Sequence, residues 1–175
     1  MRGHRVRLLV YGAIDTANEL CRLARLLGWH TVVADARRAL LTPERIDAAA
    51  ELFGGWPEDV YARFGLDRRT AVVLLTHEER FDTPACVGAL ASDAFYIGVL
   101  GSRRYQRLNR ERLRAAGVGD EALARIHGPC GLDLGAESPA ETALSILAEI
   151  VAVEHRAGGL PRSLPRQSGA VLAVS

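Results

Sequence analysis

The sequence predicts an α/β fold with a doubly wound, mainly parallel sheet and helices on both faces. Short apolar runs, typical of buried strands, alternate along the chain with segments of helical spacing. The first strand, helix and strand together take about 30 residues, the size of a βαβ unit. With 175 residues, 49% of them hydrophobic, the chain can form one well-buried domain but not two ordinary ones.

The first elements follow one another closely. Residues 6–11 form an apolar run that predicts a buried strand, and Gly12 leads from it into a helix that ends at Gly28. The apolar face of this helix contains Leu20, Leu23, Ala24 and Leu27. Residues 30–34 predict the second strand, which ends at Asp35. A helix is then expected from Thr42, with Pro43 at its first position, to the turn at residues 54–57.

Two further strands are predicted after a less regular region. Residues 70–76 form the third apolar run, and Pro84 begins a helix that ends near residue 91. Residues 95–100 form the fourth apolar run, which leads directly into an arginine-rich helix. Strands and helices therefore alternate throughout this part of the chain.

The C-terminal part contains the clearest helix signal. A short helix is expected from residue 120 to about 126, followed by a loop at residues 127–135 whose three glycines and proline exclude a regular helix. Ser138, Pro139 and Glu141 form a capping box for the next helix. We predict a single domain over residues 1–158 and a loose tail over 159–175, in which residues 170–174 could add a strand or contact a partner.

Composition and charge exclude several classes of protein. The net charge of +1 gives no electrostatic reason to expect nucleic acid or an anionic membrane as partner. All 22 basic residues are arginines, which excludes lysine chemistry. The three cysteines lack the spacing of a zinc or redox site, and the set His127, Cys130 and Asp133 matches no zinc pattern, so we expect no metal site. The N-terminus fits neither a signal peptide nor a membrane span, and we expect a cytoplasmic protein.

A doubly wound sheet binds ligands beyond the carboxyl ends of its strands, near the topological switch. Asp35 follows Gly12 at a separation close to that at which a Rossmann dinucleotide fold places the acid that binds the ribose hydroxyls. Ile14 occupies the position of the second fingerprint glycine, however, and Asp15 would repel a pyrophosphate. Productive dinucleotide binding and a purely structural role for Gly12 and Asp35 therefore both stay open.

The fourth predicted strand ends in a candidate anion site. Gly98 and Gly101 allow the backbone to approach another group closely, and Ser102 precedes the arginine-rich helix. The helix dipole disfavours positive charge in the first turn, so Arg103 and Arg104 are best explained by a bound anion or a partner carboxylate. The arginines farther along this helix are expected to form a solvated surface.

His77 and Asp82 are the candidate catalytic residues. They follow the third predicted strand, at the edge of the sheet where ligands are expected. A histidine and a carboxylate there could transfer a proton or bind a metal. The alternative is a cluster that only caps the following helix.

Several separate stretches carry a family resemblance. They are Gly12, Asp35-Ala36-Arg37, Thr76-His77 with Asp82, Tyr96 to Arg104, Pro129 to Gly135, and Pro139 to Ile146. In this order they resemble the Rossmann-type C-terminal domain of the XdhC/CoxI proteins, accessory factors for molybdenum hydroxylases such as xanthine dehydrogenase and aerobic CO dehydrogenase. The resemblance covers residues 6–153.

The resemblance implies a protein that helps to make or insert the molybdenum cofactor. The terminal sulfido ligand of that cofactor is one candidate for the group that it handles. It implies an NAD(P) or molybdopterin-type cofactor bound by Gly12, Asp35, Arg37, Gly98, Gly101, Ser102, Arg103 and Asp133. This chain differs from the usual family member in two features. The usual member has a preceding domain with a glycine- and cysteine-containing segment, and its first loop commonly reads Gly-x-Gly-His where this chain has Ile14 and Asp15.

Three functions follow as hypotheses. The first is an accessory protein that binds a nucleotide or the cofactor's phosphate and works with a molybdenum hydroxylase or with a separate partner protein of the XdhC type. The second is a small NAD(P)-dependent oxidoreductase, with Asp35 on the ribose and His77 as proton donor. The third is a degenerate module that serves as an interaction or dimerisation surface, and a homodimer is expected.

Overall fold

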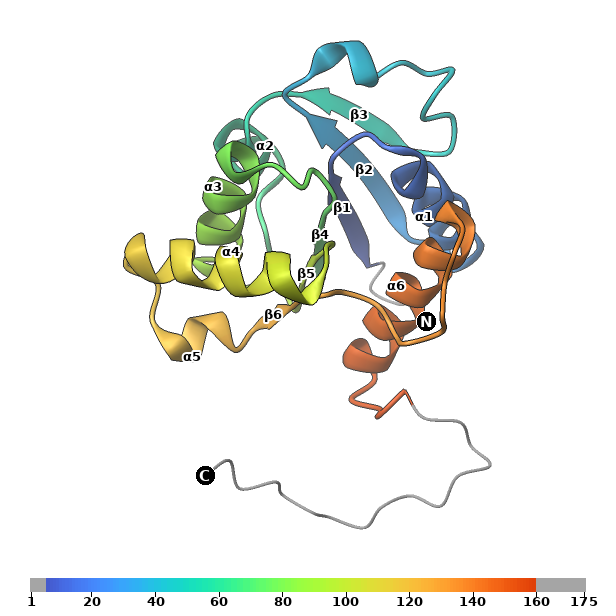
Figure 1. Cartoon of the computed structure of the whole chain (residues 1–175). Helices are drawn as coiled ribbons and strands as arrows, with labels where there is room; N and C mark the ends of the chain where they lie inside the picture. The colour runs from blue at the N-terminus through green and yellow to red at the C-terminus, as the bar shows by residue number, and fades with distance from the viewer. Residues whose placement is uncertain (1–5, 160–175) are drawn as a thin grey trace.

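The structure, a computed structural model, describes residues 6–159 and has a parallel sheet between two layers of helices (Figure 1). Within these residues the sheet has six strands, in the order β3-β2-β1-β4-β5-β6. The strands are β1 (Arg7–Tyr11), β2 (His30–Asp35), β3 (Glu51–Gly54), β4 (Thr70–Leu74), β5 (Tyr96–Val99) and β6 (Ile126–His127). Every pairing is parallel, which confirms the predicted doubly wound, Rossmann-like sheet.

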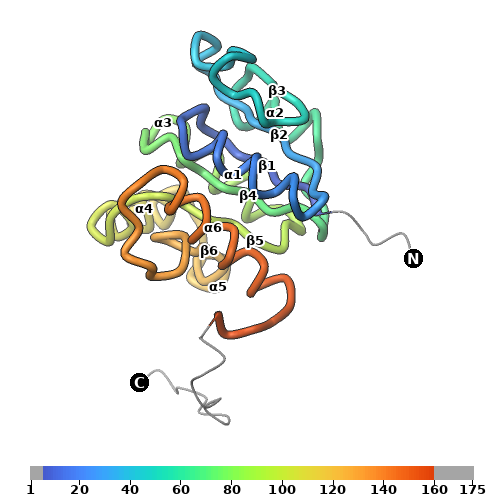
Figure 2. Tube along the Cα trace, turned by 90° about the vertical axis from the view of Figure 1, so that its right-hand side faces the viewer, coloured from blue at the N-terminus to red at the C-terminus, as the bar shows by residue number. Residues whose placement is uncertain are grey.

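The helices divide between the two faces of the sheet. They are α1 (Asp15–Leu26), α2 (Pro57–Phe64), α3 (Glu79–Leu90), α4 (Arg103–Ala115), α5 (Asp120–Leu123) and α6 (Pro139–Glu154), with a 3-10 turn η1 (Arg38–Leu40). Figure 1 shows α1 and α6 on one face and α2, α3 and α4 on the other. In the view turned by 90°, α1 and α6 lie in front of the sheet (Figure 2).

Alternate side chains of β1 enter two separate hydrophobic cores. Leu8 and Val10 pack with residues of α1 and α6, such as Leu20 and Ile146. Leu9 packs on the other side, in the core that contains residues of α2, α3 and α4. Because both faces of the strand are buried, its sequence is a continuous apolar run.

The helix predicted from Thr42 is wrong. The carbonyl oxygen of Thr42 accepts hydrogen bonds from Arg45 and Ile46, which close one turn only. The chain then extends, because Asn18 of α1 accepts a hydrogen bond from the Ala48 amide at 3.0 Å, and residues 51–54 pair with β2 as strand β3. These tertiary hydrogen bonds outweigh the local helix signal.

Three other boundaries differ from the prediction. Trp56 and Pro57, expected to end a helix, instead begin α2, with Pro57 at its first position. Helix α3 begins at Glu79, before Pro84. The short helix predicted to end near residue 126 is shorter than expected and ends at Leu123. Residues 126–127 form strand β6 instead, which pairs with β5.

Helix α6 confirms its predicted capping box. The Ser138 hydroxyl accepts a hydrogen bond from the Glu141 amide at 3.2 Å, and the Glu141 carboxylate accepts one from the Ser138 amide at 3.0 Å. The loop before α6 contains no regular helix, as predicted. Nearly all of the predicted tail, including residues 170–174, lies outside the described residues, so that prediction and the domain boundary at residue 158 stay predictions.

Candidate functional site

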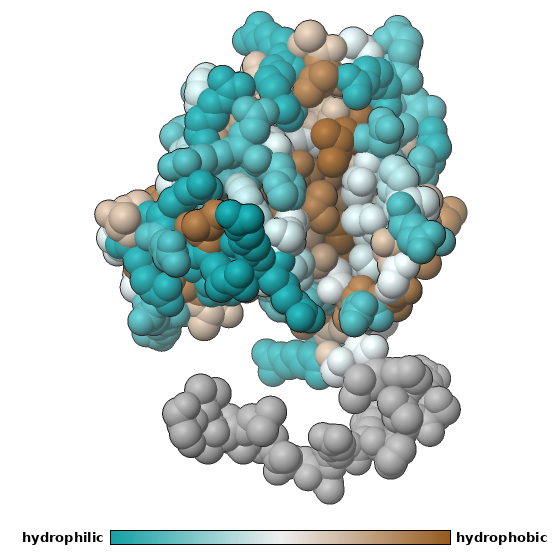
Figure 3. All heavy atoms as spheres, viewed as in Figure 1, coloured by the Kyte–Doolittle hydropathy of each residue, from teal (hydrophilic) through white to brown (hydrophobic). Residues whose placement is uncertain are grey.

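The topological switch lies between β1 and β4, which are neighbours in the sheet. The chain leaves β1 toward α1 on one face and leaves β4 toward α3 on the other (Figure 1). Figure 3 shows a furrow along the middle of this side of the molecule, with hydrophobic atoms at its base and polar side chains on both rims. Ligands bind at such a crevice in doubly wound sheets.

Gly12 allows the loops after β1 and β4 to approach each other. Its φ is +119°, in the region that favours glycine, and its amide donates to the Ala34 carbonyl. A Cβ at this position would lie 3.0 Å from backbone atoms of Leu75 and Thr76. Gly12 is therefore needed for packing, and its predicted role in cofactor binding is not required to explain it.

Asp35 is fully buried at the end of β2, and its carboxylate accepts four hydrogen bonds. Oδ1 accepts from the Arg37 amide and Nε at 2.8 and 2.9 Å, and Oδ2 accepts from the Ala13 amide and Arg37 Nη2 at 2.9 and 2.8 Å. Burial alone would raise the pKa of Asp35, but these hydrogen bonds hold it below the usual value. All four acceptor positions are filled, which leaves none for a ribose hydroxyl.

Arg37 connects the end of β2 to the loop after β4. Its Nη1 donates to Glu78 at 2.7 Å, while Nε and Nη2 donate to Asp35. Glu78 in turn pairs with Arg80 at 2.9 Å. The charge of Arg37 is thus compensated within the protein.

Asp82 and His77 lie close together without forming a direct acid–base pair. Asp82 is buried in α3, and its two oxygens accept hydrogen bonds from the hydroxyls of Thr76 and Tyr105. Burial raises the pKa of Asp82. The exposed His77 ring lies over the Tyr105 ring, with centroids 4.4 Å apart. Tyr105 thus contacts both residues: its hydroxyl donates to Asp82, and its ring packs against His77.

His77 has an unusual backbone conformation. Its φ of 57° is left-handed, which is uncommon for residues other than glycine and occurs often at functional sites. Gly101, with φ +134°, provides the space for its ring, because a Cβ there would lie 2.7 Å from His77 Nε2. The loops after β4 and β5 thus meet at the carboxyl edge of the sheet, where the sequence analysis expects ligands to bind.

Ser102 caps α4, and the first two residues of this helix are cationic. The Ser102 hydroxyl accepts a hydrogen bond from the Tyr105 amide at 3.1 Å. Arg103 and Arg104 are exposed, and within residues 6–159 neither forms an ion pair with a carboxylate. Farther along α4, Arg114 pairs with Asp120 at 2.9 Å.

Gly98 and the loop before α6 form a packed structural unit. A Cβ on Gly98 would lie 2.7 Å from the Tyr96 ring and 3.0 Å from Cys130. Glu149 of α6 accepts hydrogen bonds from Tyr96 at 2.5 Å and from the Gly131 amide at 2.8 Å. Gly98 therefore faces this packing and not the crevice. Asp133 of the same loop is exposed, and its carboxylate has no hydrogen-bond partner within the described residues.

The described residues contain no group of three or more histidine, cysteine or acidic side chains placed to hold a metal ion. In the same part of the chain, no helix has the length and apolar character needed to cross a membrane. All three cysteines are buried and free. Burial raises the pKa of Cys21 to about 11 and that of Cys86 to about 12, which makes these thiols inert.

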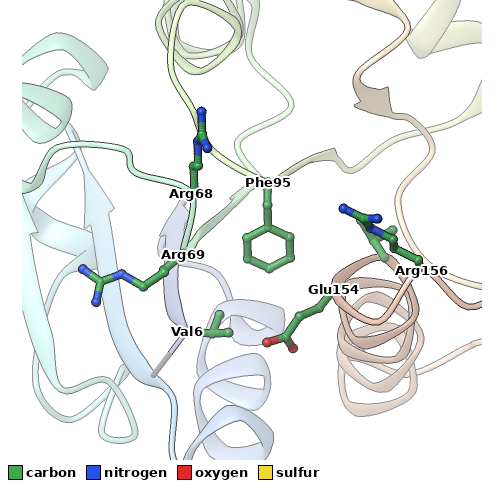
Figure 4. A pocket seen from close by; sticks show the side chains of 7 residues that line it. Val6, Arg68, Arg69, Phe95, Glu154 and Arg156 are labelled. Atoms are coloured by element: carbon green, nitrogen blue, oxygen red, sulfur yellow. The ribbon is translucent and has the colours of Figure 1, made fainter. Parts of the chain in front are cut away.

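A separate cavity lies at the opposite, amino edge of the sheet (Figure 4). It has a volume of about 360 Å³, and Phe95 points into it between two groups of charged side chains. The lining residues are Val6, Arg68, Arg69, Phe95, Val153, Glu154 and Arg156. These residues precede the strands or end α6, so the cavity is not part of the crevice at the switch.

Sequence reasoning missed one residue of the site, Tyr105, and the ion pair between Arg37 and Glu78. Tyr105 contacts both candidate catalytic residues, and Glu78 binds Arg37. Tyr105 lies three positions after Ser102, on the first turn of the arginine-rich helix that was expected to begin at the ligand-binding edge, which was a usable signal. Glu78 belongs to the polar cluster that follows the third predicted strand, but its pairing with Arg37 had no signal, because the two residues lie 41 positions apart.

Comparison with known proteins gives a consistent result. Residues 8–150 match the family described as XdhC Rossmann domain. The chain is 36% identical over 180 residues to the uncharacterized protein YqeB of Escherichia coli, covering 99% of this chain and 32% of YqeB. It is 30% identical to a probable xanthine dehydrogenase subunit from Bacillus subtilis, over 86% of this chain and 43% of the relative. It is also 30% identical to the molybdenum cofactor insertion chaperone PaoD of E. coli, over 85% and 40% respectively.

A solved structure shows the same fold. The crystal structure of a xanthine dehydrogenase from Bacillus halodurans superposes with a TM-score of 0.75 and 26% identity, covering 87% of this chain and 45% of that one. The chain thus spans less than half the length of each of these relatives. The match over residues 8–150, the sheet order and the crevice motifs lead to one conclusion: the chain belongs to the XdhC Rossmann domain family.

Proposed function

We propose that this chain acts as an accessory domain in the maturation of a molybdenum hydroxylase and binds a phosphate-bearing cofactor at the carboxyl edge of its sheet. Support comes from the relatives, one of which is a molybdenum cofactor insertion chaperone and another a probable xanthine dehydrogenase subunit. The proposed partner is a hydroxylase or a separate protein of the XdhC type. Homodimer formation stays a prediction.

The observation that carries the proposal is the uncompensated charge at the start of α4. Arg103 and Arg104 occupy a helix turn where the dipole disfavours cations, and they form no ion pair within residues 6–159. A bound phosphate would be attracted both by the positive end of the helix dipole and by the two arginines, which offsets their repulsion. It would also accept hydrogen bonds from both guanidinium groups. His77 lies next to Gly101 at the same place, where it can hold or donate a proton.

The charge of the residues present suits a phosphate-bearing pterin, because they supply cationic hydrogen-bond donors beside a furrow with a hydrophobic base. They do not supply a thiol. All three cysteines are buried, so sulfur transfer through a cysteine of this chain is not part of the proposal. We propose binding and delivery of the cofactor.

The proposal is tested by measuring binding of molybdenum cofactor released from a purified hydroxylase, followed by its fluorescence after oxidation. The double variant Arg103→Ala/Arg104→Ala should bind at least roughly tenfold more weakly, since two charge-assisted contacts are lost. Arg107→Ala is the matched control, because it removes an exposed charge one turn farther along α4. Equal binding by the double variant and the control would contradict the proposal.

The alternative of an NAD(P)-dependent oxidoreductase receives less support. Asp35 has no acceptor position left for a ribose diol, and Ile14 stands at the start of α1 without a capping side chain. An interaction module would use surfaces that include the predicted tail, which lies outside the described residues.

A further inference from the structure

The cavity at the amino edge of the sheet has an apolar base (Figure 4). Its volume of about 360 Å³ falls within the range of small-molecule sites, roughly 300–1,000 Å³. The Phe95 ring points into the cavity, and Val6 and Val153 add apolar surface beside the ring. Phe95 and Val153 pack against the core on the α1 side of the sheet, so the fold holds this base in place.

Two of the arginines that line the cavity are already engaged with carboxylates that do not line it. Arg68 pairs with Asp93 at 3.9 Å, and Arg69 pairs with Asp67 at 3.0 Å. Figure 4 shows the guanidinium groups of both arginines pointing away from the Phe95 ring. Neither arginine therefore contributes an available charge to the base of the cavity.

The charges that face the apolar base come from the end of α6. Figure 4 shows the side chains of Glu154 and Arg156 extending toward the middle of the cavity. Within residues 6–159, no ion pair joins these two side chains, and Arg156 pairs with no other carboxylate. Glu154 pairs with His155 at 3.9 Å, a contact that carries two charges only when the ring is protonated. An anion and a cation thus lie beside one apolar surface without neutralising each other.

Arg156 also occupies a backbone position that favours glycine. Helix α6 ends in a Schellman motif, in which the amides of Arg156 and Ala157 donate to the carbonyls of Val153 and Ala152 at 3.1 and 2.7 Å. The left-handed residue of this motif is usually glycine, but here it is Arg156, with a φ of 53°. A left-handed arginine costs conformational free energy that glycine would not. Backbone strain of this kind clusters at functional sites, and it points to a use for the guanidinium group.

We infer that this cavity binds an α-amino acid with an apolar side chain. The carboxylate of the ligand pairs with Arg156, its ammonium group pairs with Glu154, and its side chain lies against the Phe95 ring. A zwitterion compensates both protein charges at once, whereas an anion or a cation alone leaves one of them unpaired. The cavity lies at the opposite edge of the sheet from the crevice, so this inference does not rest on the proposed function.

The test compares three probes at pH 7: L-phenylalanine, phenylpropionate, which lacks the ammonium group, and phenethylamine, which lacks the carboxylate. Amide chemical shifts of the isotope-labelled full chain report both the affinity and the place of binding. L-Phenylalanine should bind about fivefold or more tightly than either single-charge probe, because a partly exposed ion pair contributes up to about that factor. The shifts should concentrate at Phe95 and at residues 153–156.

Two variants test the two charges separately. Glu154→Gln should bring the affinities for L-phenylalanine and phenylpropionate within about twofold, and Arg156→Gly should do the same for L-phenylalanine and phenethylamine. Because glycine suits the left-handed position, Arg156→Gly should not lower the midpoint of thermal unfolding, and weaker binding then cannot come from loss of the fold. Glu121→Gln and Arg107→Ala are the matched controls, because both residues are exposed and neither lines the cavity.

The inference is overturned if L-phenylalanine causes no saturable shift at about 10 mM, or if a single-charge probe binds as tightly. It is also overturned if the control variants weaken binding as much as the variants at the cavity, or if the shifts centre on the crevice at the other edge of the sheet. The double variant Arg103→Ala/Arg104→Ala should bind L-phenylalanine as the unmodified protein does, so this inference and the molybdenum-cofactor proposal fail independently.

Discussion

Replacing Arg37 by methionine should destabilise the protein strongly and in a pH-dependent way. The change keeps an apolar stem of similar length but removes the guanidinium that donates two hydrogen bonds to the buried Asp35 carboxylate. Asp35 keeps only the backbone amides of Ala13 and residue 37 as donors. The fully buried negative charge of Asp35 then keeps only two of its four hydrogen-bond donors and loses its cationic partner.

The magnitude follows from these contacts. Hydrogen bonds to charged groups contribute about 1.5–3 kcal/mol each, and removal of one partner of a buried ion pair costs about 3–5 kcal/mol in total. The pair with Glu78 is partly exposed and adds little. We therefore expect Arg37→Met to lower the free energy of unfolding by about 3–5 kcal/mol at pH 7, a large part of the typical 5–15 kcal/mol.

The pH dependence has a defined sign. In the unmodified protein the pKa of Asp35 is lowered, so its stabilising contribution is present above the unfolded pKa and is lost only as the pH falls through the lower folded value. In Arg37→Met, burial without the guanidinium raises the pKa of Asp35 above the unfolded value. The variant then gains stability as the pH falls from 7 toward 4, and its deficit shrinks.

Urea unfolding of both proteins at pH 7 and pH 5 measures this difference. Arg38→Met is the control for stability, because it removes the adjacent, exposed arginine and should cost less than about 0.5 kcal/mol. Asp35→Asn added to Arg37→Met should recover part of the loss, since the stranded charge is gone. A deficit below about 1 kcal/mol at pH 7, or an equal deficit at both pH values, would refute the reasoning.

Three further predictions concern packing, capping and reactivity. Gly98→Ala should destabilise by about 1–3 kcal/mol, because its Cβ would meet the Tyr96 ring at 2.7 Å, and an unchanged urea midpoint would contradict this packing. Ser138→Ala should cost about 0.5–2 kcal/mol by thermal unfolding through loss of the α6 cap, whereas Ser138→Asp should keep most of the stability. The three buried thiols should resist a thiol reagent in the native protein and react only after unfolding, and rapid native labelling would show that one of them is accessible.

Local signals predicted most of the fold. The strands at 6–11, 30–34, 70–76 and 95–100 were visible because parallel strands buried on both faces are continuous apolar runs. Helix α6 was visible because its capping box and first-turn proline are adjacent in sequence. Strands β3 and β6 were missed because each is short and lies at an edge of the sheet. Only pairing with a neighbouring strand distinguishes such a segment from a turn or a helix end, and this pairing is not visible in the sequence.

For the candidate site, the sequence determined the chemical groups and the edge of the sheet on which they lie. Gly12, His77 and Ser102 each follow a predicted strand, and parallel strands bring such loops together. The family was also identifiable from ordered motifs. These conclusions depend on residue type and order, which the sequence contains directly.

Only the tertiary structure decided which of these groups remain available to a ligand. The sequence position of Asp35 indicates a ribose-binding acid, but all acceptor positions of its carboxylate are occupied by hydrogen bonds from Arg37 and Ala13. Arg38, in contrast, has no ion pair within the described residues and lies beside a cavity. Gly98 faces Tyr96 and Cys130 instead of the crevice. Hydrogen-bond saturation and packing depend on the positions of groups far apart in the chain, and no local pattern encodes them.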